Sequence, residues 1–133
     1  MDNAIFNSKH NYRKCCKPLD SHRGGEACGI IDVKPDKKGF CSVGLYNRKL
    51  KLAVALKYKK KQLPWLTNWQ HWGFGDYVTG IEPGTNPPTG QIKAREQKQL
   101  ITLKPGQSKT YELAISVLTG RDQISKFTKT AGR

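Results

Sequence analysis

Apolar and polar residues alternate along much of the chain, which is the pattern of β-strands with one buried face. The alternation is clearest at 50–57, where leucine or valine stands at every second position and lysine or alanine stands between them. Turns rich in glycine, proline, asparagine and lysine separate similar short runs. The strands predicted in this way are 27–33, 40–46, 50–57, 63–72, 76–82, 99–103 and 111–117. Seven or so short strands with almost no helix predict an all-β fold, an antiparallel β-sandwich.

The same pattern divides the chain into three parts. Residues 1–25 are predicted to form a basic, irregular N-terminal arm, and residues 26–120 hold the β-sandwich. Residues 121–133 are predicted to form a short helical turn and a basic tail. In that turn Ile124 and Phe127 stand three residues apart, so both are expected to pack back against the sandwich.

The last part of the predicted sandwich contains a hairpin. Residues 91–98 are polar and are expected to be a loop or a frayed strand. Residues 104–107, Lys-Pro-Gly-Gln, suit a type II turn, with proline followed by glycine. The strands 99–103 and 111–117 on either side of this turn are therefore expected to pair with each other.

Composition limits the class of protein. The chain has 133 residues, enough for one domain, but only 36% of them are hydrophobic, so part of the chain is expected to need a partner surface. No run approaches the roughly 20 apolar residues that cross a bilayer, and the first residues lack a secretory signal pattern. A cytoplasmic protein without membrane contact is expected.

The four cysteines predict neither a metal site nor a disulfide framework. No C-x-x-C pair occurs, and only three histidines are available as further ligands. Cys28 and Cys41 lie in apolar, strand-like runs and are expected to be small core residues. The sequence predicts no metal and no other cofactor.

The net charge raises nucleic acid as a partner. Lysine and arginine number 24 against 10 aspartate and glutamate, for a formal charge of +14. Such an excess is typical of nucleic-acid-binding proteins. The basic residues are nevertheless spread over turns and tails, with no recognisable nucleic-acid-binding motif, so solvated turns are the favoured interpretation. Nucleic acid is the less favoured partner.

A candidate site stands at the end of one predicted strand. In 76–82 the pattern places Tyr77, Thr79 and Ile81 on one face and Val78, Gly80 and Glu82 on the other. Glu82 is the last residue before a loop rich in proline and glycine, a position that combines rigid support with access. The alternative is a solvated glutamate without a function.

Aromatic residues gather just before this strand. Within thirteen positions the chain carries Trp65, Trp69, Trp72, Phe74 and Tyr77. Aromatic rings stack on the C–H faces of sugars, and carboxylates and amides grip the hydroxyl groups. The polar candidates for this role are Asn68, Gln70, Glu82 and Asn86. The alternative is that the tryptophans fill the sandwich core.

Several segments in order resemble one family. LPWLTNWQ at 63–70 and GDYVTGIEPGTN at 75–86 resemble the C-terminal signature of a bacterial branch of the galactose mutarotase-like superfamily, which is related to aldose 1-epimerases. LKPGQ at 103–107 and ELAI at 112–115 resemble the closing hairpin of that superfamily. The resemblance implies that the chain is the C-terminal part of a β-supersandwich that binds a carbohydrate in a cleft.

The resemblance also implies roles for individual residues. Glu82 matches the glutamate that acts as general base on the anomeric hydroxyl of an aldose. The sugar is expected to be held by Trp69, Gln70, Asn86 and Arg95. His71 is a further candidate for sugar binding because it is close to Glu82 in the sequence, but it does not match the position of the family's acid histidine. A second copy or a completing chain is expected to cover the sheet that half a supersandwich exposes.

Three functions follow as hypotheses. The first is a carbohydrate-binding protein that resembles aldose 1-epimerases, truncated and weakly active or inactive. The second is a non-enzymatic carbohydrate-binding β-sandwich, which would have no turnover to lose when Glu82 is replaced. The third is a basic nucleic-acid-binding protein, whose affinity would fall steeply with salt.

Overall fold

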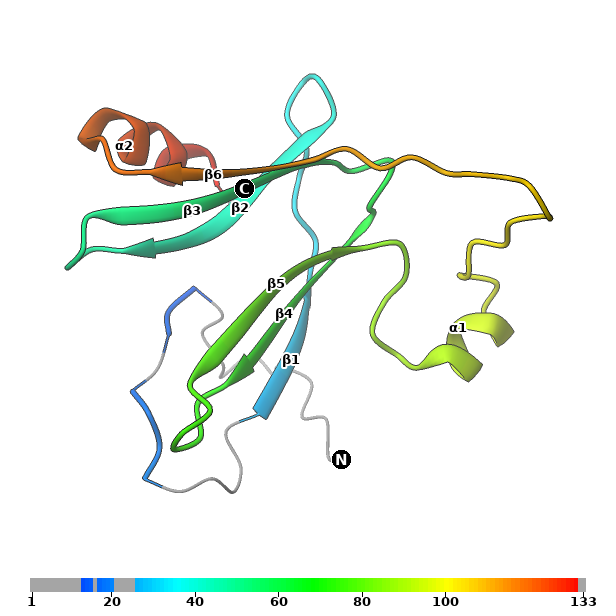
Figure 1. The fold of residues 1–133 in the computed structure, drawn as a ribbon, viewed down its shortest axis with the longest axis horizontal. Helices are drawn as coiled ribbons and strands as arrows, with labels where there is room; N and C mark the ends of the chain where they lie inside the picture. Colours follow the sequence, from blue (N-terminus) through cyan, green and yellow to red (C-terminus); the bar gives the residue numbers. More distant parts are fainter. Residues whose placement is uncertain (1–12, 16, 21–25, 132–133) are drawn as a thin grey trace.

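The computed structural model describes residues 13–15, 17–20 and 26–131, and this part of the chain forms six β-strands and two α-helices (Figure 1). The strands are β1 Glu26–Ile31, β2 Phe40–Asn47, β3 Leu52–Lys59, β4 Trp65–His71, β5 Val78–Gly84 and β6 Leu113–Leu118. The helices are α1 Gln91–Glu96 and α2 Arg121–Thr130. The prediction of an all-β, antiparallel fold is confirmed.

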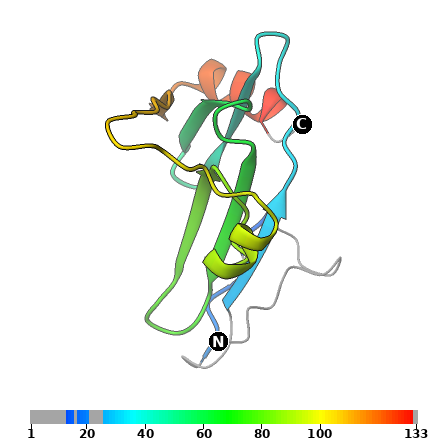
Figure 2. The same ribbon diagram turned by 90° about the vertical axis from the view of Figure 1, so that its right-hand side faces the viewer.

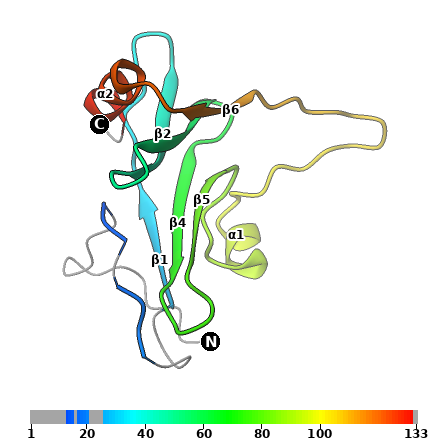
Figure 3. The ribbon, with the colours of Figure 1, turned by 60° about the vertical axis from the view of Figure 1, so that its left-hand side comes forward.

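The strands form two antiparallel sheets of three strands each. One sheet has the order β1-β4-β5 and the other the order β2-β3-β6. Figures 1 and 3 show β1 running upward into the connection that leads to β2, so the chain crosses from one sheet to the other. Each sheet therefore combines segments that are distant in the sequence.

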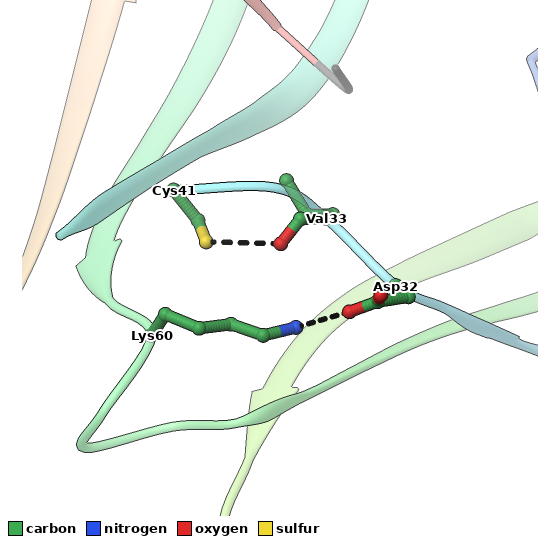
Figure 4. Close-up of polar contacts among 4 residues, drawn as sticks. All are labelled: Asp32, Val33, Cys41 and Lys60. Carbon is green, nitrogen blue, oxygen red and sulfur yellow. Dashed lines mark hydrogen bonds and ion pairs between the residues drawn. The ribbon is translucent and has the colours of Figure 1, made fainter. Parts of the chain in front are cut away.

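The core lies at the junction of the two sheets. Its buried residues come from both sheets and from the connections between them, namely Val33, Cys41, Val43, Tyr58, Leu63 and Leu66. At this junction the Cys41 thiol donates a hydrogen bond to the carbonyl oxygen of Val33 over 3.6 Å. An exposed ion pair between Lys60 Nζ and Asp32 Oδ1, 2.7 Å long, spans the same region (Figure 4).

Helix α2 packs against part of one face of the β2-β3-β6 sheet. Ile124 is buried, and the ring of Phe127 lies beside Gly44 of β2. The prediction that Ile124 and Phe127 pack back onto the sheets is confirmed. The helix is ten residues long, however, so the expectation of one helical turn was wrong. Its residues after Gly120 are compatible with a helix throughout and include neither glycine nor proline.

Residues 91–96 form helix α1, although a loop or frayed strand was expected. This segment has no strand alternation, and Ile92, Lys93, Ala94, Arg95 and Glu96 are residues that helices accept. Ala94 is fully buried, so tertiary packing anchors the short helix. Figure 2 shows α1 in front of the β1-β4-β5 sheet.

The predicted hairpin of 99–103 with 111–117 is also wrong. The turn itself exists, since the Gln107 N–H donates to the Lys104 carbonyl over 3.0 Å, but no strand forms at 99–103. Strand β6 pairs with β3 instead, with Ile115 opposite Leu56. Figure 3 shows the segment between α1 and β6 extending away from both sheets. The non-local pairing with apolar β3 replaces the local one.

Candidate functional site

Three strands bring the candidate side chains onto one face of the β1-β4-β5 sheet. Antiparallel pairing aligns residues in rows across the sheet, and alternate residues of each strand share a face. The rows on this face are Glu26-His71-Val78, Cys28-Trp69-Gly80 and Ile30-Thr67-Glu82. We call this surface the Glu82 face. The prediction that Val78, Gly80 and Glu82 share a face is confirmed.

The Glu82 face looks away from the core. On the opposite face of the same sheet, Leu66 belongs to the core, and Ile31 and Ile81 pack against it. Figure 1 shows this sheet nearly edge-on, with the β2-β3-β6 sheet on one side and α1 on the other. The Glu82 face is therefore on the side of α1.

Glu82 is exposed and lies within β5 rather than at its end. The expectation that the strand ends at Glu82 was wrong, because β5 continues through Pro83 to Gly84. Proline is tolerated there because β5 is the edge strand of its sheet. The Glu82 carboxylate folds back over Gly80, into the space that a side chain at position 80 would occupy. The absence of a side chain at Gly80 thus makes room for this carboxylate.

Trp69 is held in place on the central strand. Its indole Nε1 donates a hydrogen bond to Glu26 Oε1 over 2.9 Å. The ring is half-buried, and its centroid is 6.3 Å from that of the His71 ring at an interplanar angle of 48°. Because one polar contact and one aromatic neighbour fix the indole, it forms a rigid apolar surface between the two carboxylates of Glu26 and Glu82.

The hydrogen bonding of His71 assigns its tautomer. The backbone N–H of Gly73 donates to Nδ1 of His71 over 3.2 Å. A nitrogen that accepts a hydrogen bond carries no proton, so the neutral ring carries its proton on Nε2. His71 can therefore donate a hydrogen bond from Nε2 to a ligand.

The pKa of the Cys28 thiol depends on the charges of the site. Burial raises the pKa of the Cys28 thiol above its ordinary value of 9.0, and the negative charges of Glu82 and Glu26 raise this pKa further. The thiol is therefore protonated at neutral pH and is a poor nucleophile. The prediction that Cys28 is a core residue was wrong, since Cys28 is half-buried on the Glu82 face, and the sequence pattern gave Glu26 no role. Their relation to Glu82 depends on the pairing of β1 with β4, which the sequence pattern does not specify.

Alkylation of Cys28 tests whether its thiol senses the Glu82 carboxylate. We expect iodoacetamide to modify Cys28 with a midpoint above pH 9.0, because burial and the two carboxylates disfavour the thiolate. Glu82→Gln removes one of these charges, so the midpoint falls and the reaction at a fixed pH becomes faster. Peptide mapping by mass spectrometry measures the rate. Glu112→Gln, directly before β6 of the other sheet, is the control, and an equal rate in the Glu82→Gln variant and the wild type would contradict this arrangement.

Gln70 lies on the opposite face of the sheet and is buried. Its side-chain nitrogen donates to Asn68 Oδ1 over 2.8 Å, and its oxygen accepts from Trp72 Nε1 over 3.2 Å. Asn68 in turn donates to Thr79 Oγ1 over 3.1 Å. The structure therefore does not bring Gln70 to the Glu82 face. Trp72 is buried too, as the core alternative for the tryptophans anticipated.

Asn86 and Arg95 lie outside the sheet. Asn86 is in the loop after β5, where its side chain accepts from the Thr85 hydroxyl over 3.1 Å and donates to the Pro87 carbonyl over 3.3 Å. Arg95 is exposed on α1. Both follow β5 in the sequence, but no hydrogen bond connects them to Glu82 in the part of the chain that the structure describes.

Two surface hollows lie near this region. The larger, of about 480 Å³, is beside α1 and contains none of the predicted site residues. The smaller, of about 300 Å³, is lined by Ile30, Ile31, Asp32, Lys60, Pro64 and Trp65. Ile30 and Trp65 have the same strand parity as Glu26 and Trp69, so the smaller hollow borders the Glu82 face. It offers room for a ligand that extends beyond Trp69.

Among residues 13–15, 17–20 and 26–131, no group of three or more histidine, cysteine, aspartate or glutamate side chains has the arrangement of a metal site. The helices in these ranges are too short or too polar to span a membrane.

Comparison with known families gives a match over most of the chain. A family model described as "Domain of unknown function (DUF4432)" matches residues 1–117. Neither the curated proteins nor the solved structures contain a match.

Proposed function

The chain belongs to the DUF4432 family, whose description names no activity, and from the contacts on its Glu82 face we propose that it binds a carbohydrate. We propose that the fold is part of the galactose mutarotase-like fold that the sequence resembles. In this proposal Glu82 is the base of the family's acid–base pair, and the acid is not part of this chain. The observation that carries the proposal is the Trp69 indole, fixed by Glu26 beside the Glu82 carboxylate.

The Trp69 ring supports stacking. A sugar ring presents C–H groups on one face and hydroxyl groups at its edge, so it needs an apolar plane with polar groups around it. Trp69 supplies the plane, and it loses little side-chain entropy on binding because Glu26 already orients it. At Gly80, next to Trp69 in the same row, the Glu82 carboxylate takes the space of a side chain, which places this acceptor beside the indole.

The polar groups around Trp69 match hydroxyl groups. The carboxylates of Glu26 and Glu82 accept hydrogen bonds, and Nε2 of His71 donates one. Hydrogen bonds to a charged carboxylate are the stronger class. This combination of acceptors, donor and aromatic plane favours a neutral polyol over a phosphate, which two carboxylates would repel.

Binding without turnover is the form of the proposal that the geometry supports best. Epimerisation needs an acid and a base that both reach one sugar, each within about 3 Å of its proton. Glu82 pairs with Thr67, and His71 is four residues further along β4. Four residues of a strand span roughly 13 Å. That spacing applies to the backbone. The Glu82 carboxylate folds back toward the Trp69 row, but no hydrogen bond joins it to His71 in the described residues, so in this proposal the acid comes from a completing chain.

Sugar binding by Glu82 can be measured directly. We expect saturation-transfer NMR with a panel of aldoses to detect binding, and exchange spectroscopy to show no acceleration of anomer interconversion. Glu82→Gln is expected to weaken binding roughly tenfold, because it removes a charge-assisted hydrogen bond. Glu112→Gln is the matched control, since it makes the same change on an exposed residue directly before β6 of the other sheet.

The outcomes separate the hypotheses. Absence of binding to every sugar, with the fold verified by circular dichroism, would overturn the proposal. Faster anomer exchange that Glu82→Gln abolishes would overturn the inactive form and make His71 the first acid to test, by His71→Ala. Sugar affinity is expected to be nearly independent of salt, whereas affinity for nucleic acid would fall steeply with salt.

A further inference from the structure

The chain exposes more surface than a compact monomer of its mass. Its accessible surface is 10312 Å², whereas a compact monomer of 15.0 kDa exposes about 7,000 Å². The excess is roughly 3,000 Å². Obligate interfaces bury at least about 2,000 Å² in total. This excess belongs to the chain as a whole and is larger than the area that such an interface buries.

Four exposed large apolar side chains, Leu45, Leu113, Ile115 and Val117, gather on one face of the β2-β3-β6 sheet. The rows on this face are Cys41-Tyr58-Leu113, Val43-Leu56-Ile115 and Leu45-Val54-Val117. All nine residues are uncharged. Seven are aliphatic, and the other two are a tyrosine and a cysteine. We call this surface the open face.

Only part of the open face is covered within the chain. Cys41, Val43 and Tyr58 are buried in the core at the junction of the sheets. Toward β6 the open face is accessible to solvent, since Ile115 and Val117 are each 65% exposed. Leu45 and Leu113 are also exposed. In the described ranges, then, one corner of an apolar sheet is packed and the rest faces solvent.

The other face of the same sheet is different. Helix α2 packs there, with Phe127 beside Gly44, and Ala53 is buried. A sheet normally buries its apolar face against another layer. The small side chains of Gly44, Ala53 and Ala55 receive the helix, whereas Ile115 and Val117 on the β6 side of the open face are exposed.

We propose that the open face binds a second copy of this chain. A two-fold dimer places the open face of one copy on that of the other, so each copy contributes the same residues. Two apolar sheets then pack face to face and complete a β-sandwich. The absence of charged residues on the nine positions keeps the net charge of +14 outside the contact.

The net charge gives this dimer a recognisable salt dependence. Two copies that each carry +14 repel one another, and salt screens that repulsion. The dimer is therefore expected to tighten as salt is added. A complex with an acidic partner would weaken under the same change, because its attraction would be screened.

Sedimentation equilibrium of the full chain tests the proposal. We expect a mass of two chains, and we expect Ile115→Asp to weaken dimerisation roughly a hundredfold or more, because each dimer would bury two unpaired carboxylates. Ser116→Asp is the matched control. It adds the same charge to the same strand, one residue further on, where the side chain points to the face that α2 covers.

The controls distinguish the open face from other modes of association. Ile115→Thr keeps a β-branched side chain and serves if Ile115→Asp does not fold; it is expected to weaken the dimer by roughly tenfold. Equal weakening by Ser116→Asp would overturn the proposal in favour of pairing along the edge of β6. A folded wild type that sediments at 15.0 kDa at all salt concentrations would overturn it as well.

Discussion

Gly44→Ala is expected to lower the stability of the fold by about 3 kcal/mol. A methyl group at position 44 would approach the carbonyl oxygen of Val54 closer than van der Waals contact allows. It would also lie 3.0 Å from both Ala55 Cα and Phe127 Cζ. The Phe127 ring can move, but the backbone of β3 is held by pairing with β2 on one side and β6 on the other. The backbone pairing between β2 and β3 would therefore be distorted.

Thermal unfolding followed by circular dichroism measures this effect. For a domain of this size the loss corresponds to a decrease in Tm of roughly 10 °C. Ser42→Ala is the control, because Ser42 lies on the same face of the same strand and becomes the same residue. A Gly44→Ala variant that unfolds at the wild-type temperature would contradict the close packing of β2, β3 and α2.

Trp69→Ala is expected to weaken carbohydrate binding by roughly thirtyfold or more, the size typical of a central aromatic contact. The substitution removes the stacking plane and leaves the Glu26 carboxylate without its indole donor. Trp69→Phe keeps a ring but loses that hydrogen bond, so an intermediate affinity is expected. Titration of the sugar observed by NMR gives the three affinities.

Phe74→Ala is the control for the loss of an aromatic side chain. Phe74 belongs to the same cluster in the sequence, but it lies in the loop between β4 and β5 and is 61% exposed. Its removal is expected to leave sugar affinity unchanged. Equal losses in the Trp69→Ala and Phe74→Ala variants would contradict a site centred on the Glu82 face.

Local pattern predicted the early strands well. Alternation placed the second, third and fourth predicted strands within a few residues of β2, β3 and β4, since each has one apolar face that must be buried. The pattern failed at 91–103, where it gave no helix and one strand too many. A segment of six residues has weak local preferences, and the burial of Ala94 decides its structure.

Strand parity predicted part of the candidate site, and the rest depends on the register between the strands. Parity alone places Trp65 and Trp69 on one face and separates Gln70 from them, because neighbouring residues of a strand point in opposite directions. Parity cannot show that the Trp69 face of β4 is also the Glu82 face of β5. A slip of one residue in their pairing would reverse that relation.

The sequence by itself determined the fold class, the composition of the strands and the presence of aromatic and acidic residues around one strand pair. Those properties depend on short-range periodicity, which each segment carries on its own. Only the tertiary structure placed Glu26 and Cys28 beside Trp69, moved β6 from a local hairpin to the edge of β3, and left the open face uncovered. These features depend on contacts between segments far apart in the chain, and such contacts form only where the whole fold makes their burial favourable.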